Sequence, residues 1–439
     1  MKNTRFPLLL AAVLALALLL RLHGISWDGG YLFHPDERRI IMVADDLSLP
    51  WPPNWRLLLS PASPWNPRFF SYGSLPIYLL RVCADLAGRL WPPLTTLDSS
   101  YLVGRVLSAL FDVGTVYLIY KLSRALYDET TGLLAALLVA ITVLHIQLSH
   151  FYAVDTLLTF FVVLTVSFAV RMGQGVKRPL SVPLGIAWGL ALATKVSAAA
   201  LAAPVLVACV LRALRETTVD REGGEPLGGR RLSWTGPLLG LVQIGTVAVL
   251  TFVLLEPYAV IDVITFVQDV LSEGYMARGL ADIPYTRQYI GTMPYLYPLK
   301  QMVVWSMGLP LGLVGWLGCL GALVATVLIT FRVKWARAAG VTVALSWVVI
   351  YFALVGSFHA KFVRYMLPII PFLCLWAAWG LVALARQAGA ASTWRRGLGP
   401  VALVAILGGS ALYTMSFMHI YRVEHPWLRA SAWICANVP

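Results

Sequence analysis

The segment Phe6–Leu22 has the sequence FPLLLAAVLALALLLRL, which is apolar except for Arg21 and long enough to cross a bilayer as one helix. Lys2 and Arg5 precede it, as they would precede the apolar core of a signal peptide, but no small-residue cleavage site follows. We therefore expect an uncleaved first transmembrane helix. Similar apolar runs recur along the whole 439-residue chain, so this segment sets the class of fold.

Composition excludes a soluble protein of this length. Hydrophobic residues make up 59% of the chain and charged residues 13%, about half the share found in soluble domains, and the mean hydropathy is +0.75. The 34 Lys and Arg residues exceed the 21 Asp and Glu residues, giving a formal charge of +13. In a membrane protein such an excess records orientation and contact with anionic headgroups, so we expect no nucleic-acid partner.

The pattern predicts an all-α polytopic membrane protein with about eleven transmembrane helices. We expect the spans at Phe6–Leu22, Tyr101–Tyr120, Thr131–Leu148, Phe151–Val170, Leu180–Val196, Ala198–Leu211, Thr235–Leu255, Met302–Phe331, Ala338–Val355, Tyr365–Ala385 and Leu398–Met418. The Met302–Phe331 run is long for one span, so it is expected to tilt or to extend beyond the lipid.

Basic residues predict the orientation of these helices. With a cytoplasmic N-terminus, the Lys- and Arg-rich short loops around 121–124, 171–178, 212–231, 332–337 and 386–396 all lie inside. Two long loops, 21–100 and 256–300, then lie outside, and the first contains Trp-Pro turns and an amphipathic stretch typical of interfacial helices. We expect one transmembrane domain, residues 1–418, and an outer tail, 419–439, that begins a truncated soluble domain.

This topology sorts the remaining polar residues by face. Fourteen of the 21 acidic residues lie on or near the outer face, counting Asp155 and Glu256 at helix ends. All seven histidines lie there as well: His23, His34, His145, His150, His359, His419 and His425. Carboxylates and imidazoles act as bases and metal ligands, which favours an active outer face. The alternative is that polar residues collect in the longer loops.

The first long loop contains the hexapeptide His34-Pro35-Asp36-Glu37-Arg38-Arg39 close to the membrane surface. An Asp in this position can take a proton from a hydroxyl, while neighbouring cations hold an anionic substrate. The alternative is a capped helix start, because Pro followed by two acidic residues suits a first helical turn.

Ionisable groups inside or beside the spans supply further candidates. Asp155 lies just inside a helix, where an acidic residue is costly and is a functional hypothesis by default; a cap or an Arg pairing is the alternative. For Asp112, deep in the second span, we expect a structural polar contact. Three cations, Lys195, Lys361 and Arg364, lie in short outer turns against the usual bias, which suggests a bound phosphate or, equally, snorkelling to lipid headgroups.

The order of these motifs resembles that of the lipid-dependent glycosyltransferases with the GT-C fold. The resemblance rests on Asp36-Glu37, the Phe69-Phe70-Ser71-Tyr72-Gly73-Ser74-Leu75-Pro76 stretch, His150 to Asp155, Ala193-Thr194-Lys195 and Arg364-Tyr365-Met366-Leu367-Pro368. It covers nearly the whole chain and is strongest toward bacterial relatives of protein O-mannosyltransferases and of the aminoarabinose transferase that modifies lipid A.

The resemblance implies transfer of a sugar from a polyprenyl-phosphate donor, with inversion, on the outer face of the plasma membrane. Asp36 would be the catalytic base with Glu37 as its motif neighbour, and Asp155 the second acidic position. Lys195, Lys361 and Arg364 would hold the donor phosphate. Tyr72 and Arg38 would contact the acceptor or the membrane interface. The acceptor itself, a protein, lipid or glycan, is not implied.

Two points stay open at this stage. The aminoarabinose-transferase branch has a Lys-Pro-Pro element where this chain has Ser71-Tyr72-Gly73-Ser74, so one donor-binding lysine is missing and that substrate is in doubt. Some enzymes with this fold use a divalent metal, and the groups that could hold one here are Asp36, Glu37, Asp155, His34, His150 and His359. The main alternative is a transporter or flippase of lipid-linked sugars, although no internal repeat supports it; a non-catalytic scaffold is a third.

Overall fold

The computed structural model describes residues 5–176, 178–222, 235–329, 335–388 and 398–438. These residues form helices and no β-strand. Among them nine helices are long and apolar enough to cross a membrane, and the pair α6 (Glu129–Ala140) and α7 (Val143–Ser149), bent by 56°, is a tenth candidate. The apolar helix α9 (Ser181–Thr194) is shorter. The predicted all-α membrane fold is confirmed.

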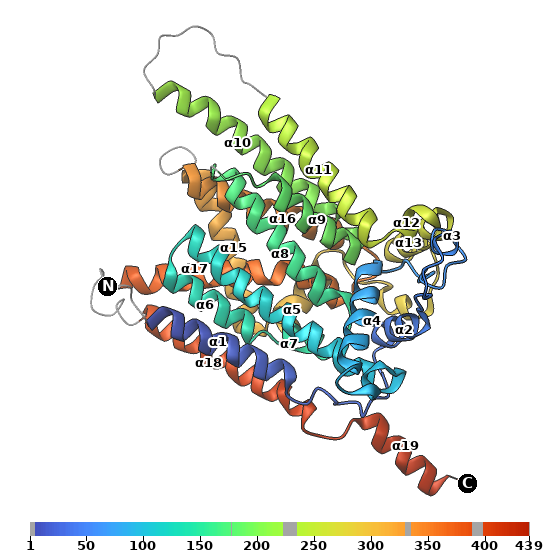
Figure 1. Ribbon diagram of the computed structural model, residues 1–439. Coiled ribbons are helices and arrows are strands. Elements are labelled where there is room, and N and C mark those ends of the chain that lie inside the picture. The colour runs from blue at the N-terminus through green and yellow to red at the C-terminus, as the bar shows by residue number, and fades with distance from the viewer. Residues whose placement is uncertain (1–4, 177, 223–234, 330–334, 389–397, 439) are drawn as a thin grey trace.

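The bundle and its two long loops are built from separate sets of helices (Figure 1). The bundle also contains α1 (Arg5–Leu22), α5 (Leu97–Leu126), α8 (Val154–Gly173), α10 (Ala202–Glu222), α11 (Thr235–Leu255), α15 (Leu309–Ile329), α16 (Trp335–Val355), α17 (Ile370–Ala388) and α18 (Leu398–Met418). The first long loop holds α2 (Pro35–Asp46), α3 (Trp55–Leu58) and α4 (Ser74–Gly88); the second holds α12 (Tyr258–Ile261), α13 (Val263–Arg278) and α14 (Leu296–Gln301). The tail forms α19 (Pro426–Asn437).

The predicted span Met302–Phe331 is interrupted near its start. A π-helical turn, Met302–Ser306, is followed by Met307 and Gly308, and α15 starts only at Leu309. Gly308 has φ +78°, a conformation that glycine adopts at little cost, and an added Cβ would lie 2.7 Å from Cδ1 of Tyr413. The apolar composition continues through the break, and for this reason the hydropathy pattern did not reveal it. Phe331 lies outside the described residues.

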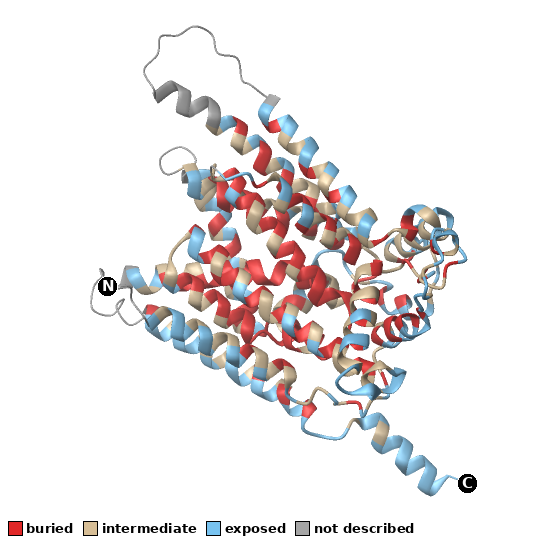
Figure 2. Cartoon of the chain, in the orientation of Figure 1, coloured by how far each residue is buried: buried red, intermediate tan, exposed pale blue. Residues whose placement is uncertain are grey.

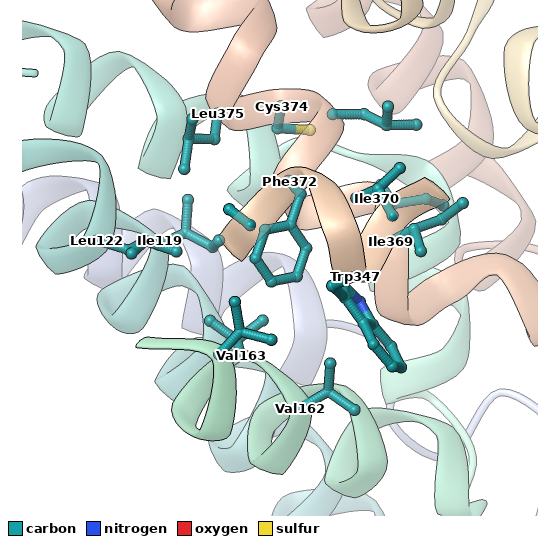
Figure 3. Close-up of a cluster of buried hydrophobic side chains, with 14 of the residues drawn as sticks. Ile119, Leu122, Val162, Val163, Trp347, Ile369, Ile370, Phe372, Cys374 and Leu375 are labelled. Atoms are coloured by element: carbon teal, nitrogen blue, oxygen red, sulfur yellow. The ribbon is translucent and has the colours of Figure 1, made fainter. Parts of the chain in front are cut away.

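The core of the bundle lies where α5, α8, α16 and α17 meet. Phe372 of α17 lies between Ile119 of α5 and Val163 of α8, and Trp347 of α16 packs beside them (Figure 3). All four side chains are at most 1% exposed. The outward faces of α1, α11 and α18 are instead exposed (Figure 2). Many of the exposed residues on these helices are large and apolar. Apolar surface of this kind is stable only when lipid covers it.

One buried ionic group fastens α1 to the bundle. Arg21 Nε donates to Asp112 Oδ2 at 2.6 Å, and His145 Nδ1 lies 2.6 Å from the other oxygen of the same carboxylate. Arg21 also donates to the carbonyl oxygens of Ala17 and Ala140, each at 3.0 Å. All three ionisable side chains are fully buried. The predicted structural role of Asp112 is therefore confirmed, because its charge is balanced inside the bundle.

The described basic residues of the short loops gather away from the two long loops. Lys121 and Arg171 line one groove between α5 and α8, and Arg386 lines another with the first half of α1. The helices α2, α4 and α13 lie at the end of the bundle opposite to the start of α1 (Figure 1). Residue 177 and the segments 223–234, 330–334 and 389–397 lie outside the described residues, as does residue 439 of the tail. These segments hold the predicted basic positions Lys177, Arg230, Arg231, Arg332, Lys334, Arg395 and Arg396.

The two long loops pack on each other. Tyr258 donates its hydroxyl to the carbonyl of Leu58 at 2.9 Å and to Ser63 Oγ at 2.7 Å. Asn66 Nδ2 donates to Asp262 Oδ2 at 2.9 Å. These contacts hold the segment that follows α3 against α12 and the start of α13. Both loops thus form one layer over the end of the bundle.

Candidate active site

The first turn of α2 carries Asp36 at the rim of this layer. His34 is the N-cap, and its Nδ1 accepts a hydrogen bond from the Glu37 N–H at 3.4 Å. Pro35 begins the helix, and the two acidic residues follow where the helix dipole favours negative charge. The predicted capped helix start is confirmed. It does not remove Asp36 from chemistry, because that side chain stays 16% exposed.

Arg364 forms an ion pair with Asp36. It lies in a 3-10 turn, Val363–Ile369, that leads into α17, and its side chain is 19% exposed. The guanidinium also lies 5.0 Å from the ring centre of Phe362 and 5.8 Å from that of Tyr365. Packing between aromatic rings orients this cation while leaving it accessible, which suits the recognition of an anionic ligand.

Lys195, like Arg364, lies near Tyr365, and it follows the C-terminal end of α9. Its Nζ is 4.8 Å from the ring centre of Tyr365 and 5.8 Å from that of Tyr72. The Gly73 N–H donates to the Thr194 carbonyl at 3.0 Å, so the first long loop is bonded directly to the α9 terminus. An added Cβ on Gly73 would lie 1.9 Å from the Ala193 carbonyl oxygen. Only glycine permits this approach, which places Tyr72 beside Lys195.

Tyr72 and Asp155 complete the group that the sequence predicted. Burial raises the pKa of the Tyr72 hydroxyl, and the charges of Asp36 and Asp155 raise it further, while Arg364 lowers it. Asp155 is 3% exposed at the start of α8 and interacts electrostatically with Lys195 and Arg364. Residues from α2, the first loop, α8, α9 and the turn before α17 therefore form one charged cluster.

The structure adds Glu273, which the sequence analysis did not single out. It lies on α13 in the second long loop and interacts with the Ser71 side chain and electrostatically with Lys195, Asp36 and Arg364. Burial raises the pKa of this carboxyl, whereas Ser71 and Lys195 lower it. The spacing of Asp262, Asp269 and Glu273, which places all three on one helix face, is the sequence signal that could have indicated it.

Glu37 is placed differently from its neighbour. Arg105 donates to both of its oxygens, Nε to Oε1 at 2.8 Å and Nη2 to Oε2 at 2.7 Å. The Tyr152 N–H also donates to Oε1, at 2.8 Å. Arg105 makes two more bonds to Asp28, at 3.0 and 2.8 Å, and all three ionisable side chains are fully buried. Glu37 thus joins α2 to α5 and to the segment before α8, and its complete burial keeps it from contact with a substrate.

The predicted metal ligands do not come together. Within the described ranges no three His, Cys, Asp or Glu side chains are arranged to hold a metal ion. His34 caps α2 and stacks on Phe151, with ring centres 4.4 Å apart. His150 has the carbonyls of Ile146 and His23 within 2.9 Å of its two ring nitrogens.

Three other predicted residues lie at the edges of the site. The His359 N–H donates to the Ala277 carbonyl at 2.9 Å, which ties the loop before Arg364 to the end of α13. Lys361 is 6% exposed, and its Nζ donates to the His359 carbonyl at 3.2 Å. Arg38 is exposed on α2. The structure shows neither Lys361 nor Arg38 in contact with the charged cluster.

Comparison with known proteins agrees with this architecture. Residues 94–222 match the family model of dolichyl-phosphate-mannose-protein mannosyltransferases. The whole chain superposes on the apo oligosaccharyltransferase of Archaeoglobus fulgidus with a TM-score of 0.60 at 15% identity, and spans 59% of that protein. The same oligosaccharyltransferase, AglB, in complex with an inhibitory peptide and a dolichol-phosphate, gives 0.58 at 12% identity, with 100% of this chain and 58% of that protein covered.

A second structural relative is of more similar length. ArnT from Cupriavidus metallidurans bound to undecaprenyl phosphate superposes with a TM-score of 0.55 at 17% identity, over 96% of this chain and 76% of that protein. No curated protein sequence matches the chain. The chain therefore has the GT-C fold of membrane glycosyltransferases, and this confirms the fold that the sequence resemblance implied.

Proposed function

We propose that this protein is an integral membrane glycosyltransferase that moves a sugar from a polyprenyl-phosphate donor to a hydroxyl acceptor on the outer face of the plasma membrane. The observation that carries the proposal is the convergence of Asp36, Lys195 and Arg364 at one end of the bundle, from elements far apart in the sequence. A carboxylate close to two cations suits a catalytic base that lies beside a bound phosphate. The undecaprenyl phosphate of ArnT and the dolichol-phosphate of AglB support a ligand of the same kind here.

Asp36 is the general base of the proposed reaction. The acceptor oxygen attacks the anomeric carbon, the bond from that carbon to the phosphate oxygen breaks, and the proton of the acceptor passes to Asp36. The lipid phosphate is already a good leaving group, so one base and a cationic phosphate site suffice and the configuration inverts. Asp36 is more accessible for this role than Glu37, which is fully buried, or Asp155, which is 3% exposed.

Arg364 and Lys195 hold the donor phosphate. Arg364 is paired with Asp36. A phosphate that binds Arg364 competes with this pair, so donor binding frees the Asp36 carboxylate to act as base. Lys195 contributes a second cation between Tyr72 and Tyr365. An arginine fork and a lysine point charge together stabilise the charge that develops on the leaving phosphate.

The other predicted site residues take supporting roles. Glu37, through Arg105, fixes the start of α2 and thereby the position of Asp36. Lys361 and His359 hold the loop that precedes Arg364. The absence of the Lys-Pro-Pro element, replaced by Ser71–Ser74, leaves Lys195 and Arg364 as the principal donor cations.

Purified protein in liposomes, given polyprenyl-phosphate sugars labelled in the sugar together with a membrane extract as acceptor source, tests the proposal. We expect label to move from the lipid to an acceptor fraction, and the lipid phosphate to appear in equal amount. Movement of intact donor between leaflets without any transfer would instead identify a flippase and contradict the proposal. Engineered thiols at residues 34 and 359 that react only from the cytoplasmic side would contradict the proposed orientation.

A further inference from the structure

One face of helix α13 packs against the segment that leads to Tyr72. From Asp262 onward, Phe266, Asp269 and Glu273 follow at helical spacing on that face. Asp269 Oδ2 accepts a hydrogen bond from the Phe70 N–H at 2.7 Å. The rings of Phe70 and Phe266 are in edge contact, with centroids 5.6 Å apart.

The next turn of the same face reaches the charged cluster. Glu273 interacts with the side chain of Ser71, the residue directly before Tyr72. Beyond it, the Ala277 carbonyl accepts from the His359 N–H at 2.9 Å, so α13 is also tied to the loop that leads to Arg364. Helix α13 therefore contacts both the segment before Tyr72 and the loop before Arg364. From this helix the Glu273 carboxyl interacts electrostatically with Lys195, Asp36 and Arg364.

Glu273 makes the cluster electrostatically unbalanced. Two cations, Lys195 and Arg364, face three carboxylates, those of Asp36, Asp155 and Glu273. Asp36 already pairs with Arg364. The Glu273 carboxylate has no cationic partner of its own among the salt bridges of the described residues. A site of this kind tolerates a weakly charged anion better than a strongly charged one.

The lipid donor and the lipid product of the proposed reaction differ in negative charge. The donor is a phosphodiester with one negative charge. Breaking its bond to the anomeric carbon leaves the electron pair on the phosphate, and the resulting monoester carries a charge of about −1.5 to −2 at neutral pH. The sugar gains its bond to the acceptor oxygen, and the proton of the acceptor stays in the site on Asp36.

We propose that Glu273 is a specificity-determining residue that weakens binding of the dianionic lipid phosphate product relative to the monoanionic donor, and so drives product release. The inference rests on the proposed function and deepens it. The second long loop then contributes to turnover, because it carries the carboxylate that selects between the two lipids.

Binding of undecaprenyl phosphate to the purified full-length protein at pH 8 tests the inference, because the monoester is a dianion there. Removal of one like charge near the phosphate strengthens binding by about tenfold. We expect Glu273→Gln to lower the Kd for undecaprenyl phosphate by this factor, and the Kd for a synthetic undecaprenyl phosphodiester by much less. Glu273→Asp keeps the charge and is expected to retain the wild-type values.

Asp269→Asn is the matched control, since it removes a carboxylate from the same helix face one turn earlier. It weakens the bond to the Phe70 N–H and is expected to lower thermal stability without tightening undecaprenyl phosphate binding. Equal or weaker binding by Glu273→Gln, in a folded protein, would overturn the inference. If wild-type protein binds neither lipid, the proposed function itself fails, and the two failures are thereby distinguished.

Discussion

Arg364 forms an ion pair with Asp36, a residue 328 positions earlier in the chain. The pair joins the first turn of α2 to the turn before α17, and both side chains remain partly exposed. A closed structural ion pair would be shielded from solvent on both sides, as Arg21 and Asp112 are. The exposure of the first pair, together with Lys195 nearby, is what makes it a candidate site for a phosphate.

The cations of this site are expected to control affinity for the lipid phosphate. Charge-assisted hydrogen bonds contribute about 1.5–3 kcal/mol each, so Arg364→Ala and Lys195→Ala should each weaken undecaprenyl phosphate binding by about ten- to hundredfold. Arg56→Ala, which removes an exposed cation from α3, is the control and should bind normally. Unchanged affinity in both site variants would show that the phosphate binds elsewhere.

Gly73 is expected to be intolerant of any side chain. Because an added Cβ would lie 1.9 Å from the Ala193 carbonyl, Gly73→Ala must separate the first long loop from the end of α9. We expect weaker undecaprenyl phosphate binding and a lower unfolding temperature. Gly245→Ala in α11, where a Cβ meets nothing within 4 Å, serves as control and should behave like wild type. Normal binding by Gly73→Ala would disprove the coupling of Tyr72 to Lys195.

Glu37 is expected to matter chiefly for folding. Breaking a buried ion pair by removing one partner costs about 3–5 kcal/mol, because the other charge stays buried without compensation. Glu37→Ala leaves Arg105 with only Asp28 as an acidic partner, so we expect a large fall in unfolding temperature by scanning fluorimetry. Glu37→Gln retains a hydrogen-bonding group, so its unfolding temperature should lie between those of the wild type and Glu37→Ala. A fully stable Glu37→Ala protein with no activity would point instead to direct catalysis.

Two histidines near the first long loop predict how stability depends on pH. Burial lowers the pKa of both His34 and His150 to about 4, below the ordinary value of 6.5. The folded state then favours neutral rings, whereas the unfolded chain takes up protons as the pH falls below 6.5. Stability contributed by these groups is present above pH 6.5 and is lost between about 6.5 and 4.

His34→Asn tests this pH dependence, because asparagine also caps helices but does not titrate in that range. The unfolding temperature of the variant should fall less steeply between pH 6.5 and 4 than that of the wild type. A parallel fall in both proteins would show that His34 does not contribute.

The sequence predicts the fold well because lipid imposes a simple requirement. A helix must stay apolar for about 20 residues to cross the bilayer, and such runs are visible without any knowledge of packing. A run that is judged only by its average hydropathy does not show where its helix is interrupted. The break at Gly308 and the bend between α6 and α7 fall inside apolar runs, and depend on backbone conformation and neighbouring side chains that hydropathy does not record.

A candidate site residue can be predicted from the sequence where a charged side chain is energetically unfavourable at its position in the membrane topology. Asp155 at a helix start and Arg364 in an outer turn break the rules for membrane segments, and this makes them visible. Glu273 breaks no rule, because an acidic residue on a loop helix is ordinary, and only the packing of α13 brings it to the cluster. The partner of Glu37 could not be found from the sequence either, since Arg105 lies 68 residues away.

The measurement that tests the account most directly is sugar transfer by Asp36→Asn, compared with wild type at equal amounts of folded protein. General-base catalysis contributes about 10²- to 10⁴-fold to rate, so we predict a loss of at least about a hundredfold in transfer. Undecaprenyl phosphate binding should be kept or tightened, because Arg364 loses the charge of its competing partner. Transfer at the wild-type rate by a well-folded Asp36→Asn protein would contradict the assignment of Asp36 as the base and the account built on it.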